Sequence, residues 1–134
     1  MNKKINLGSI PLGSEPFAIA EDFINVKKSI LYIARDDREI FNIKEKLKWL
    51  LPNTEILIYR SWDQIPYDNV SPSKEIQSER IRTLIQLSTK NKKIILTSIN
   101  AIIQKTINKT YLDKNLITIS VNQKINFNKF ILTL

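Results

Sequence analysis

The sequence turns from apolar to acidic within the nine residues Ser29-Ile30-Leu31-Tyr32-Ile33-Ala34-Arg35-Asp36-Asp37. The apolar run that opens this stretch is typical of a short strand buried in a parallel sheet. Aspartates directly after a strand cap and charge the start of a helix. The stretch therefore predicts a strand that passes straight into a helix, the repeating unit of an α/β domain.

The helix that follows carries one apolar stripe and ends at Pro52-Asn53. The stripe repeats at intervals of three and four residues: Ile40, Ile43, Leu47 and Leu50. Similar patterns predict strands over 55–59, 93–97 and 116–121, and helices over 17–27, over 75–88 and after the cap residue Ser98. The core candidates of these helices are Phe17, Ala20, Phe23 and Ile24, then Ile81, Leu84, Ile85 and Leu87, and finally Ile99, Ile102 and Ile103.

The alternation of strands and helices predicts an α/β fold with a largely parallel sheet and helices on both faces. A chain of 134 residues is long enough for about one domain. Residues 127–134 begin another helix or strand. Because this apolar end needs something to pack on, we expect the chain to be the first part of a longer protein.

Composition excludes several classes of protein. The chain has no cysteine and no histidine, which excludes a disulfide framework, a thiolate nucleophile and the usual metal ligand and general base. No apolar run approaches the roughly 20 residues of a membrane span, and the residues after Met1 lack a signal-peptide core, so we expect a cytoplasmic protein. The net charge of +8 favours anionic partners. However, only 5 of the 21 cations are arginine, and we attribute the excess to a compositional bias toward lysine and a solvated surface.

A glycine-containing loop at Gly8–Phe17 lies ahead of the first predicted helix, where a phosphate loop would stand. Such a loop needs a lysine after its last glycine and backbone N–H groups aimed at the phosphates. Here Gly13 and Ser14 are followed by Glu15, Pro16 and Phe17. Glutamate repels phosphate and proline lacks an N–H, so we interpret the loop as degenerate or purely structural.

Two further segments contain side chains that could form a catalytic or binding site. The loop 61–73 holds two carboxylates, Asp63 and Asp68, and aromatic side chains that could stack on bases. The plainer interpretation is a long loop held to the domain by Trp62 and Tyr67. In the next helix Arg80 and Arg82 could contact phosphates, or pair with glutamates on a solvated helix surface.

This loop and helix resemble the N-terminal region of the bacterial transcription-repair coupling factors (Mfd). The matching run is Trp62-Asp63-x-Ile65-Pro66-Tyr67-Asp68-x-x-Ser71-Pro72-x-x-Glu75-Ile76-x-Ser78-x-Arg80-Ile81-x-Thr83-Leu84-x-x-Leu87. The resemblance continues through Ile94–Lys105 and, upstream, through Ile30–Pro52, so it covers roughly residues 7–134. It assigns the motif positions to an interface or to fold stabilisation: Trp62, Asp63, Pro66, Tyr67, Asp68, Ser71, Pro72, Ile76, Ser78, Arg80, Leu84 and Leu87.

The resemblance also implies a fold and domain boundaries. In this family the N-terminal module is similar to the excision-repair subunit UvrB, with a RecA-like domain of the P-loop NTPase type that has lost its phosphate loop. Residues 1–121 would be the first segment of that incomplete domain. Residues 122–134 would begin an inserted domain, of the type that binds UvrA, and most of that insert would lie outside this chain.

The function implied is that of a non-catalytic scaffold segment, with no catalytic residue, no metal ligand and no cofactor of its own. In the full-length family, helicase-like motor domains of superfamily 2 use ATP and Mg²⁺ to translocate on double-stranded DNA. They remove stalled RNA polymerase from damaged DNA, while the N-terminal module recruits UvrA for nucleotide-excision repair. We expect the partners of this segment to be the remaining domains of the same protein.

Two alternatives remain open at this stage. The first is a UvrB-like helicase segment that still binds a nucleotide. The second is a stand-alone basic module that binds nucleic acid through Arg80, Arg82 or Lys90–Lys93, with affinity that falls steeply as salt rises.

Overall fold

Three parallel strands form the sheet in the computed structural model, which describes residues 8, 10–64 and 71–124. They are β1 (Ile30–Ala34), β2 (Ile56–Tyr59) and β3 (Ile94–Ser98), in the order β1-β3-β2. Ile94 of β3 is paired with Ile30 on one side and Ile56 on the other. All five residues of this central strand are buried. The predicted α/β class and the parallel sheet are therefore confirmed.

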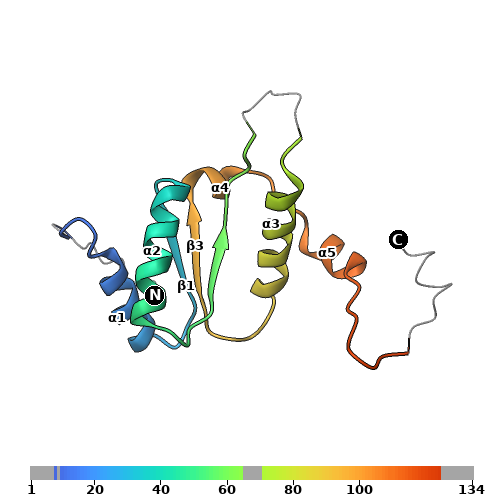
Figure 1. Ribbon diagram of the computed structural model, residues 1–134, viewed down its shortest axis with the longest axis horizontal. Coiled ribbons are helices and arrows are strands. Elements are labelled where there is room, and N and C mark those ends of the chain that lie inside the picture. The colour runs from blue at the N-terminus through green and yellow to red at the C-terminus, as the bar shows by residue number, and fades with distance from the viewer. Residues whose placement is uncertain (1–7, 9, 65–70, 125–134) are drawn as a thin grey trace.

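Two helices, α1 (Glu15–Asn25) and α2 (Asp37–Leu50), cover one face of the sheet (Figure 1). The predicted stripe of α2 is confirmed, since Ile40, Ile43 and Leu47 are buried in the core and Leu50 packs against it. In α1 the buried face is turned by a residue or two from the prediction. Its members are Pro16, Ile19, Ala20 and Phe23, whereas Phe17 and Ile24 are exposed.

Helix α3 (Lys74–Leu87) lies on the opposite side of the sheet from α1 and α2 and packs along β2 (Figure 1). Helices on both faces are thus confirmed, but none of the predicted core residues of α3 is fully buried, and Leu84 and Ile85 are half-buried. Ile81 and Leu87 are 41% and 40% exposed, while the buried residues are Ile76, Arg80 and Thr83. Thr83 faces inward because its hydroxyl donates a 2.7 Å hydrogen bond to the carbonyl of Ile58.

Two short helices follow β3. As predicted, the Ser98 side chain caps α4 (Ile99–Ile103), accepting a hydrogen bond from the N–H of Ala101. The buried residue of α4 is Ala101, whereas the predicted Ile99, Ile102 and Ile103 are exposed. Helix α5 (Lys109–Asn115) begins at the cap residue Asn108 and was not predicted. None of its residues is buried, so it has no apolar stripe that would reveal a helix in the sequence.

The predicted strand over 116–121 is wrong. These residues have neither strand nor helix conformation, and all six are exposed. Their β-branched composition favours a strand, but a strand also needs a neighbour with which to form hydrogen bonds. In the part of the chain that the structure describes, the sheet ends at β1 and β2, and residues 116–121 pair with neither strand.

Residues 125–134, where we predicted a further element and most of the start of an inserted domain, lie outside the described residues. So do residues 1–7. Among the helices that are described, none combines the length and the apolar character needed to cross a membrane.

Candidate functional site

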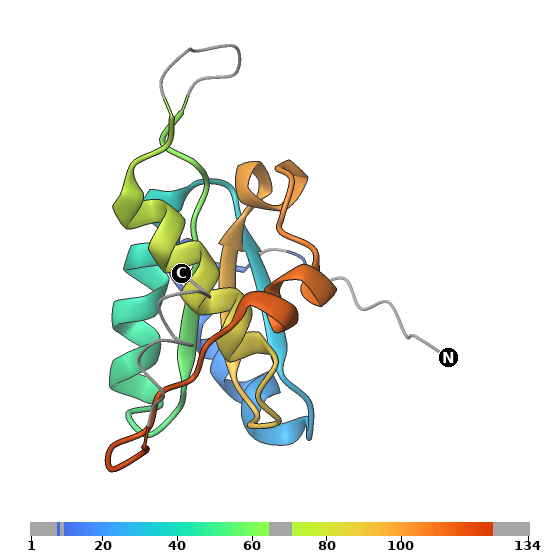
Figure 2. The same ribbon diagram turned by 90° about the vertical axis from the view of Figure 1, so that its right-hand side faces the viewer.

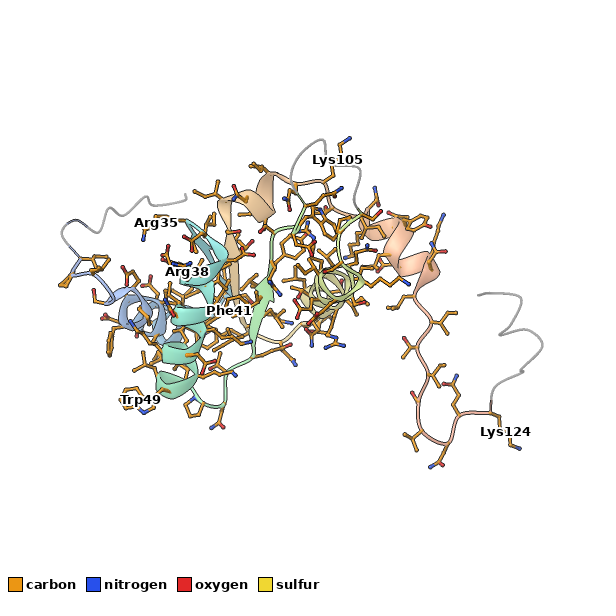
Figure 3. All side chains as sticks on the ribbon, turned by 45° about the horizontal axis from the view of Figure 1, so that its top comes forward. Arg35, Arg38, Phe41, Trp49, Lys105 and Lys124 are labelled. Carbon is orange, nitrogen blue, oxygen red and sulfur yellow. The ribbon has the colours of Figure 1, made fainter. Side chains whose placement is uncertain are left out.

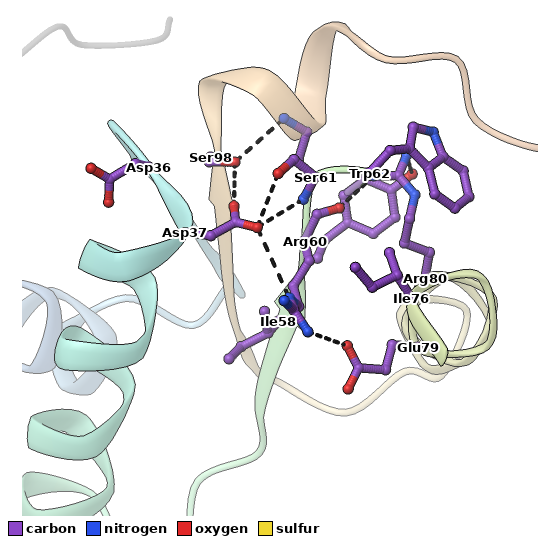
Figure 4. Close-up of polar contacts among 12 residues, drawn as sticks. Asp36, Asp37, Ile58, Arg60, Ser61, Trp62, Ile76, Glu79, Arg80 and Ser98 are labelled. Atoms are coloured by element: carbon purple, nitrogen blue, oxygen red, sulfur yellow. Dashed lines mark hydrogen bonds and ion pairs between the residues drawn. The ribbon is translucent and has the colours of Figure 1, made fainter. Parts of the chain in front are cut away.

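The carboxyl ends of parallel strands are where α/β sheets bind their ligands. In this chain three segments meet at that edge (Figure 4). The β1–α2 connection contributes Asp36 and Asp37, β2 is followed by Arg60 and Ser61, and β3 ends at Ser98. These residues are therefore the first place to look for a binding or catalytic site.

The carboxylate of Asp37 is the centre of this edge. Its Oδ1 accepts a 2.7 Å hydrogen bond from the Ser98 hydroxyl. Its Oδ2 accepts from the hydroxyl and the N–H of Ser61, at 3.0 and 3.3 Å, and lies 3.9 Å from Nε of Arg60. The first turn of α2 is thus joined directly to the ends of the other two strands. Both carboxylate oxygens already have partners within the chain.

Arg60 extends this network toward α3. Its Nη1 lies 3.3 Å from Oε2 of Glu79, and its guanidinium carbon lies 5.4 Å from the ring centre of Phe41. Glu79 therefore pairs across elements with Arg60 instead of forming one of the pairs along the helix surface that the sequence suggested. One arginine connects α2, β2 and α3.

Arg80 has a different role from the phosphate contact considered above. Only 2% of its surface is exposed, and its guanidinium carbon lies 4.1 Å from the ring centres of both Tyr59 and Trp62. Its Nη2 donates to the Tyr59 hydroxyl at 2.6 Å, and its Nη1 donates to the carbonyl of Arg60. Arg80 is held inside the protein and is not available to an external phosphate.

Gln104 completes this cluster from the residue after α4. Its Oε1 accepts from the backbone N–H of Trp62 at 2.9 Å and from Nη1 of Arg80 at 3.4 Å. Burial lowers the pKa of Arg80, an effect that Tyr59 and Asp37 oppose. Burial also raises the pKa of Tyr59. The cation is therefore kept in a partly apolar site by two rings and by carbonyl, hydroxyl and amide oxygens.

The two ends of the 61–73 loop are joined at its base. The N–H of Ser73 donates to Asp63 at 3.1 Å, and the Ser73 hydroxyl accepts from the N–H of Ile76 and so caps α3. Gln77 donates to the carbonyl of Pro72 at 2.7 Å. Ser78 donates to the carbonyl of Lys74, Ser71 is exposed, and Leu84 is half-buried. Pro66, Tyr67 and Asp68 lie outside the described residues.

The degenerate phosphate loop predicted at Gly13–Phe17 is not confirmed. Gly13 has a φ of +89°, Glu15 begins α1, and Pro16 is buried. No described strand leads into this loop, although phosphate loops follow a strand. The strand-turn-helix geometry occurs instead at Ala34–Asp37, which has no glycine and three charged residues.

A groove of about 550 Å³ runs between Gly13 and the start of α2, and charges of both signs line it. Arg35, Arg38 and Lys46 face it together with Glu15, Asp36 and Glu39. Hydrogen bonds from Tyr32, at 2.7 Å, and from Arg35 lower the pKa of Glu39. Asp36 accepts a 2.8 Å bond from the N–H of Glu39 as the predicted cap of α2. The groove lacks the excess of positive charge that would attract a polyphosphate.

Two of the lysines considered for nucleic-acid contacts, Lys92 and Lys93, also have partners within the chain. Lys93 is 2% exposed; its Nζ donates to the carbonyl of Gln86 at 2.6 Å and lies 3.6 Å from Oε2 of Glu55. Nζ of Lys92 lies 4.0 Å from the ring centre of Phe23. In the ranges that the structure describes, no three Asp or Glu side chains are grouped closely enough to hold a metal ion.

The sequence analysis missed the Asp37 network, although a signal was present. Asp or Ser stands at the carboxyl end of each described strand: Asp36 and Asp37 after β1, Ser61 after β2, and Ser98 as the last residue of β3. In a parallel sheet those positions come together at one edge. From local sequence, Asp37 and Ser98 indicate only the start of a helix. Their contacts across the sheet follow from the parallel pairing of the strands.

Comparison with known proteins gives one consistent result. No protein-family model matches the chain. Five curated proteins that do match it are all named transcription-repair-coupling factor. The protein of Rickettsia bellii (strain RML369-C) is 27% identical over 121 residues, which are 89% of this chain and 11% of that protein.

Two other relatives agree with this result. The protein of Haemophilus influenzae is 27% identical over 128 residues, covering 96% of this chain and 11% of the relative. The protein of Escherichia coli (strain K12) is 22% identical over 97 residues, which are 72% of this chain and 8% of that protein. The resemblance inferred from the Trp62–Leu87 motif is thereby confirmed. The chain spans about a tenth of the length of the curated relatives it matches.

Replacing Arg80 tests whether it stabilises the fold. Arg80→Ala leaves the Tyr59 hydroxyl and the Arg60 carbonyl without their donor, so we expect it to lower the free energy of unfolding by about 2–4 kcal/mol. Arg80→Lys should also destabilise, because a single ammonium cannot replace a stacked, forked guanidinium. Urea unfolding measures both. Arg82→Ala, at an exposed position of the same helix, is the control and should change stability by less than about 0.5 kcal/mol.

Asp63 should make stability depend on pH. Hydrogen bonds from the hydroxyl and the N–H of Ser73 lower its pKa. A lowered pKa in the folded state adds stability above the unfolded value of about 3.9, and this contribution is lost as pH falls through the folded value. The stability difference between wild type and Asp63→Asn should be constant near neutral pH and should shrink below about pH 4. A difference that does not change with pH, or an equal change for the exposed control Asp113→Asn, would contradict this assignment.

Proposed function

We propose that this chain is a non-catalytic scaffold segment of a transcription-repair coupling factor. The comparisons support a segment of such a protein, since every relative that matches carries that name. The carboxyl edge of the sheet supports the scaffold role. Asp37 binds Ser61 and Ser98 there, so the usual ligand position of an α/β domain is filled by the chain's own side chains.

The same observation disfavours a segment that still binds nucleotide. A phosphate group placed at the start of α2 would meet the carboxylates of Asp36 and Asp37, and like charges repel. The β1–α2 turn has no glycine to bring backbone N–H groups close to a phosphate. We also include in the proposal a RecA-like domain with a degenerate phosphate loop at Gly13–Phe17, where Glu15 and Pro16 follow the glycine.

The remaining parts of the proposal come from the family resemblance. In the whole protein, ATP-driven motor domains would move on double-stranded DNA and remove stalled RNA polymerase from damaged DNA. This segment would hold the inserted domain that recruits UvrA and would dock on other domains of the same polypeptide. It would itself need neither ATP nor Mg²⁺.

A basic nucleic-acid-binding module is less well supported by the contacts. Arg80 is stacked between two rings, Lys93 is paired with Glu55, and the Lys92 ammonium donates to the carbonyl of Phe23. Of the cations proposed for phosphate contacts, these three are committed to the fold. A contact energy that already stabilises the protein is not available for binding DNA.

Two measurements test the proposal. Titration of the chain with ATP and Mg²⁺, followed by calorimetry, should give no saturable heat. Glu15→Lys, which restores a lysine near the glycine of the first loop, should change nothing. Saturable binding, or ATP hydrolysis stimulated by DNA, would contradict the scaffold role.

A chimaera tests the biological role. The 134 residues replace the matching stretch of the Haemophilus influenzae factor, and survival after ultraviolet damage is measured in cells that lack their own factor. We expect restored survival for the chimaera and for its Arg82→Ala control, and reduced survival for Arg80→Ala because the scaffold is destabilised. Failure of a chimaera that accumulates normally would count against the proposed function.

A further inference from the structure

An apolar groove follows the side of α3 that faces away from the sheet. It consists of two cavities, of about 230 and 250 Å³, that share Leu84 and Ile107. Trp62 and Ile81 line the first cavity, and Leu87 and Leu112 line the second. Figure 2 shows α5 beside α3, so the second wall is the segment that leads into and through α5. The groove is formed by two elements distant in sequence.

Three of the four residues that we predicted for the core of α3 line this groove instead. Ile81, Leu84 and Leu87 recur every three residues, and the neighbouring Gln77 and Ser88 also line the cavities. The opposite face of α3 is already packed on β2 through Ile76, Arg80 and Thr83. Helix α3 therefore has a second apolar stripe, and a stripe of this kind is characteristic of a helix that has a further partner.

The charges around the groove are mostly positive. No acidic residue occurs between positions 80 and 93, and residues 105–114 contain three lysines against one acid, Asp113. Arg80, Lys92 and Lys93 are engaged in the fold, as described above. Lys109 lines the second cavity, and Lys90, Lys105 and Lys114 are exposed in the segments that follow α3 or lead through α5. Arg82 faces a separate cavity beside Arg60 and Thr83. A second copy of the chain would bring the same positive charge to the contact, so the surface favours an acidic partner instead.

We propose that the groove between α3 and α5 docks an amphipathic helix whose apolar stripe is flanked by Asp and Glu. The source rests on the proposed function: the helix comes from another part of the coupling-factor polypeptide, since this chain spans about a tenth of its relatives. Positions 77 to 88 extend over about 16 Å of helix, which matches a partner helix of about three turns. Apolar side chains fill the cavities, and its carboxylates face the lysines on the rim.

Trp62 provides a built-in reporter for the test. The other tryptophan, Trp49, is 80% exposed on α2, and Figure 3 shows it on the far side of the molecule from Lys105 and Lys124. In the Trp49→Phe variant, fluorescence therefore reports on the groove alone. The probe is a 14-residue helical peptide with leucine at positions 4, 8 and 11 and glutamate on both flanks of that stripe. A second peptide carries lysine in place of each glutamate.

We expect the acidic peptide to shift the Trp62 emission in a saturable way, with an affinity that falls as salt rises. It should bind about tenfold more tightly than the lysine peptide, since each of several rim pairs contributes a small energy. Ile81→Glu places a charge in the wall and should abolish binding, and Lys109→Glu should weaken it. The matched control is Ile24→Glu on the exposed face of α1, which should leave binding unchanged.

Three results would overturn the proposal. They are an unchanged Trp62 emission, equal binding of the acidic and lysine peptides, or self-association in sedimentation that Ile81→Glu removes, which would make the occupant a second copy. The source is tested by hydrogen exchange in the chimaera, where the α3 amides should be better protected than in the isolated chain. Equal protection of the α3 amides in the chimaera and in the isolated chain would show that the docked helix does not come from the coupling-factor polypeptide. The peptide titration involves no other domain. A chimaera that fails in repair while the peptide still binds would therefore contradict the proposed function but not the proposal that the groove docks an acidic helix.

Discussion

The structure depends on one carboxylate. Asp37 stands in the first turn of α2, and its two oxygens accept hydrogen bonds from residues that follow β2 and end β3. Strands of a parallel sheet are separated by long connections, so their ends are not held together by tight turns. Side-chain bonds across the carboxyl edge supply that connection here, and they engage both oxygens of Asp37.

A second polar cluster continues this role on the other face of the sheet. Arg60 binds Glu79 of α3, and Arg80 of the same helix binds the backbone of Arg60 and the Tyr59 hydroxyl. Helix α3 is therefore attached to the end of β2 by guanidinium contacts, in addition to the burial of Ile76 and Thr83. Ile81, Leu84 and Leu87 lie outside these contacts and line the surface groove. The polar cluster also gives two residues of the family motif, Trp62 and Arg80, contacts within the fold.

The parts of the fold that were predictable from sequence are those with a simple period. The stripe Ile40–Leu47 of α2 and the apolar run of β3 each reflect local burial against one surface. The inward face of α3 was not predictable, because an arginine is buried only when Tyr59, Trp62 and Gln104 surround it. Residues 116–121 show the converse: their composition favours a strand, but pairing requires a neighbour that local sequence does not specify.

The residues at the carboxyl edge of the sheet divide in the same way, into features set by local sequence and features set by distant residues. Asp36 and Ser98 were recognised as caps because a cap needs only the next turn of helix. The partners of Asp37 could not be read from its neighbours, since Ser61 and Ser98 lie 24 and 61 residues away. The degenerate phosphate loop at Gly13 was inferred from glycine spacing, from its place before the first helix and from Glu15 and Pro16. The strand-turn-helix geometry that a phosphate requires is found at Ala34–Asp37 instead.

The most direct test of the account is a double-mutant cycle between Asp37→Ala and Ser98→Ala, measured by urea unfolding. If the carboxylate closes the sheet edge, the two changes should be non-additive, with a coupling of about 1–2 kcal/mol, as expected for a hydrogen bond to a charged group. Additive effects, together with an Asp37→Ala variant as stable as the wild type, would contradict the account. Asp37 would then be an acidic group kept for an external partner.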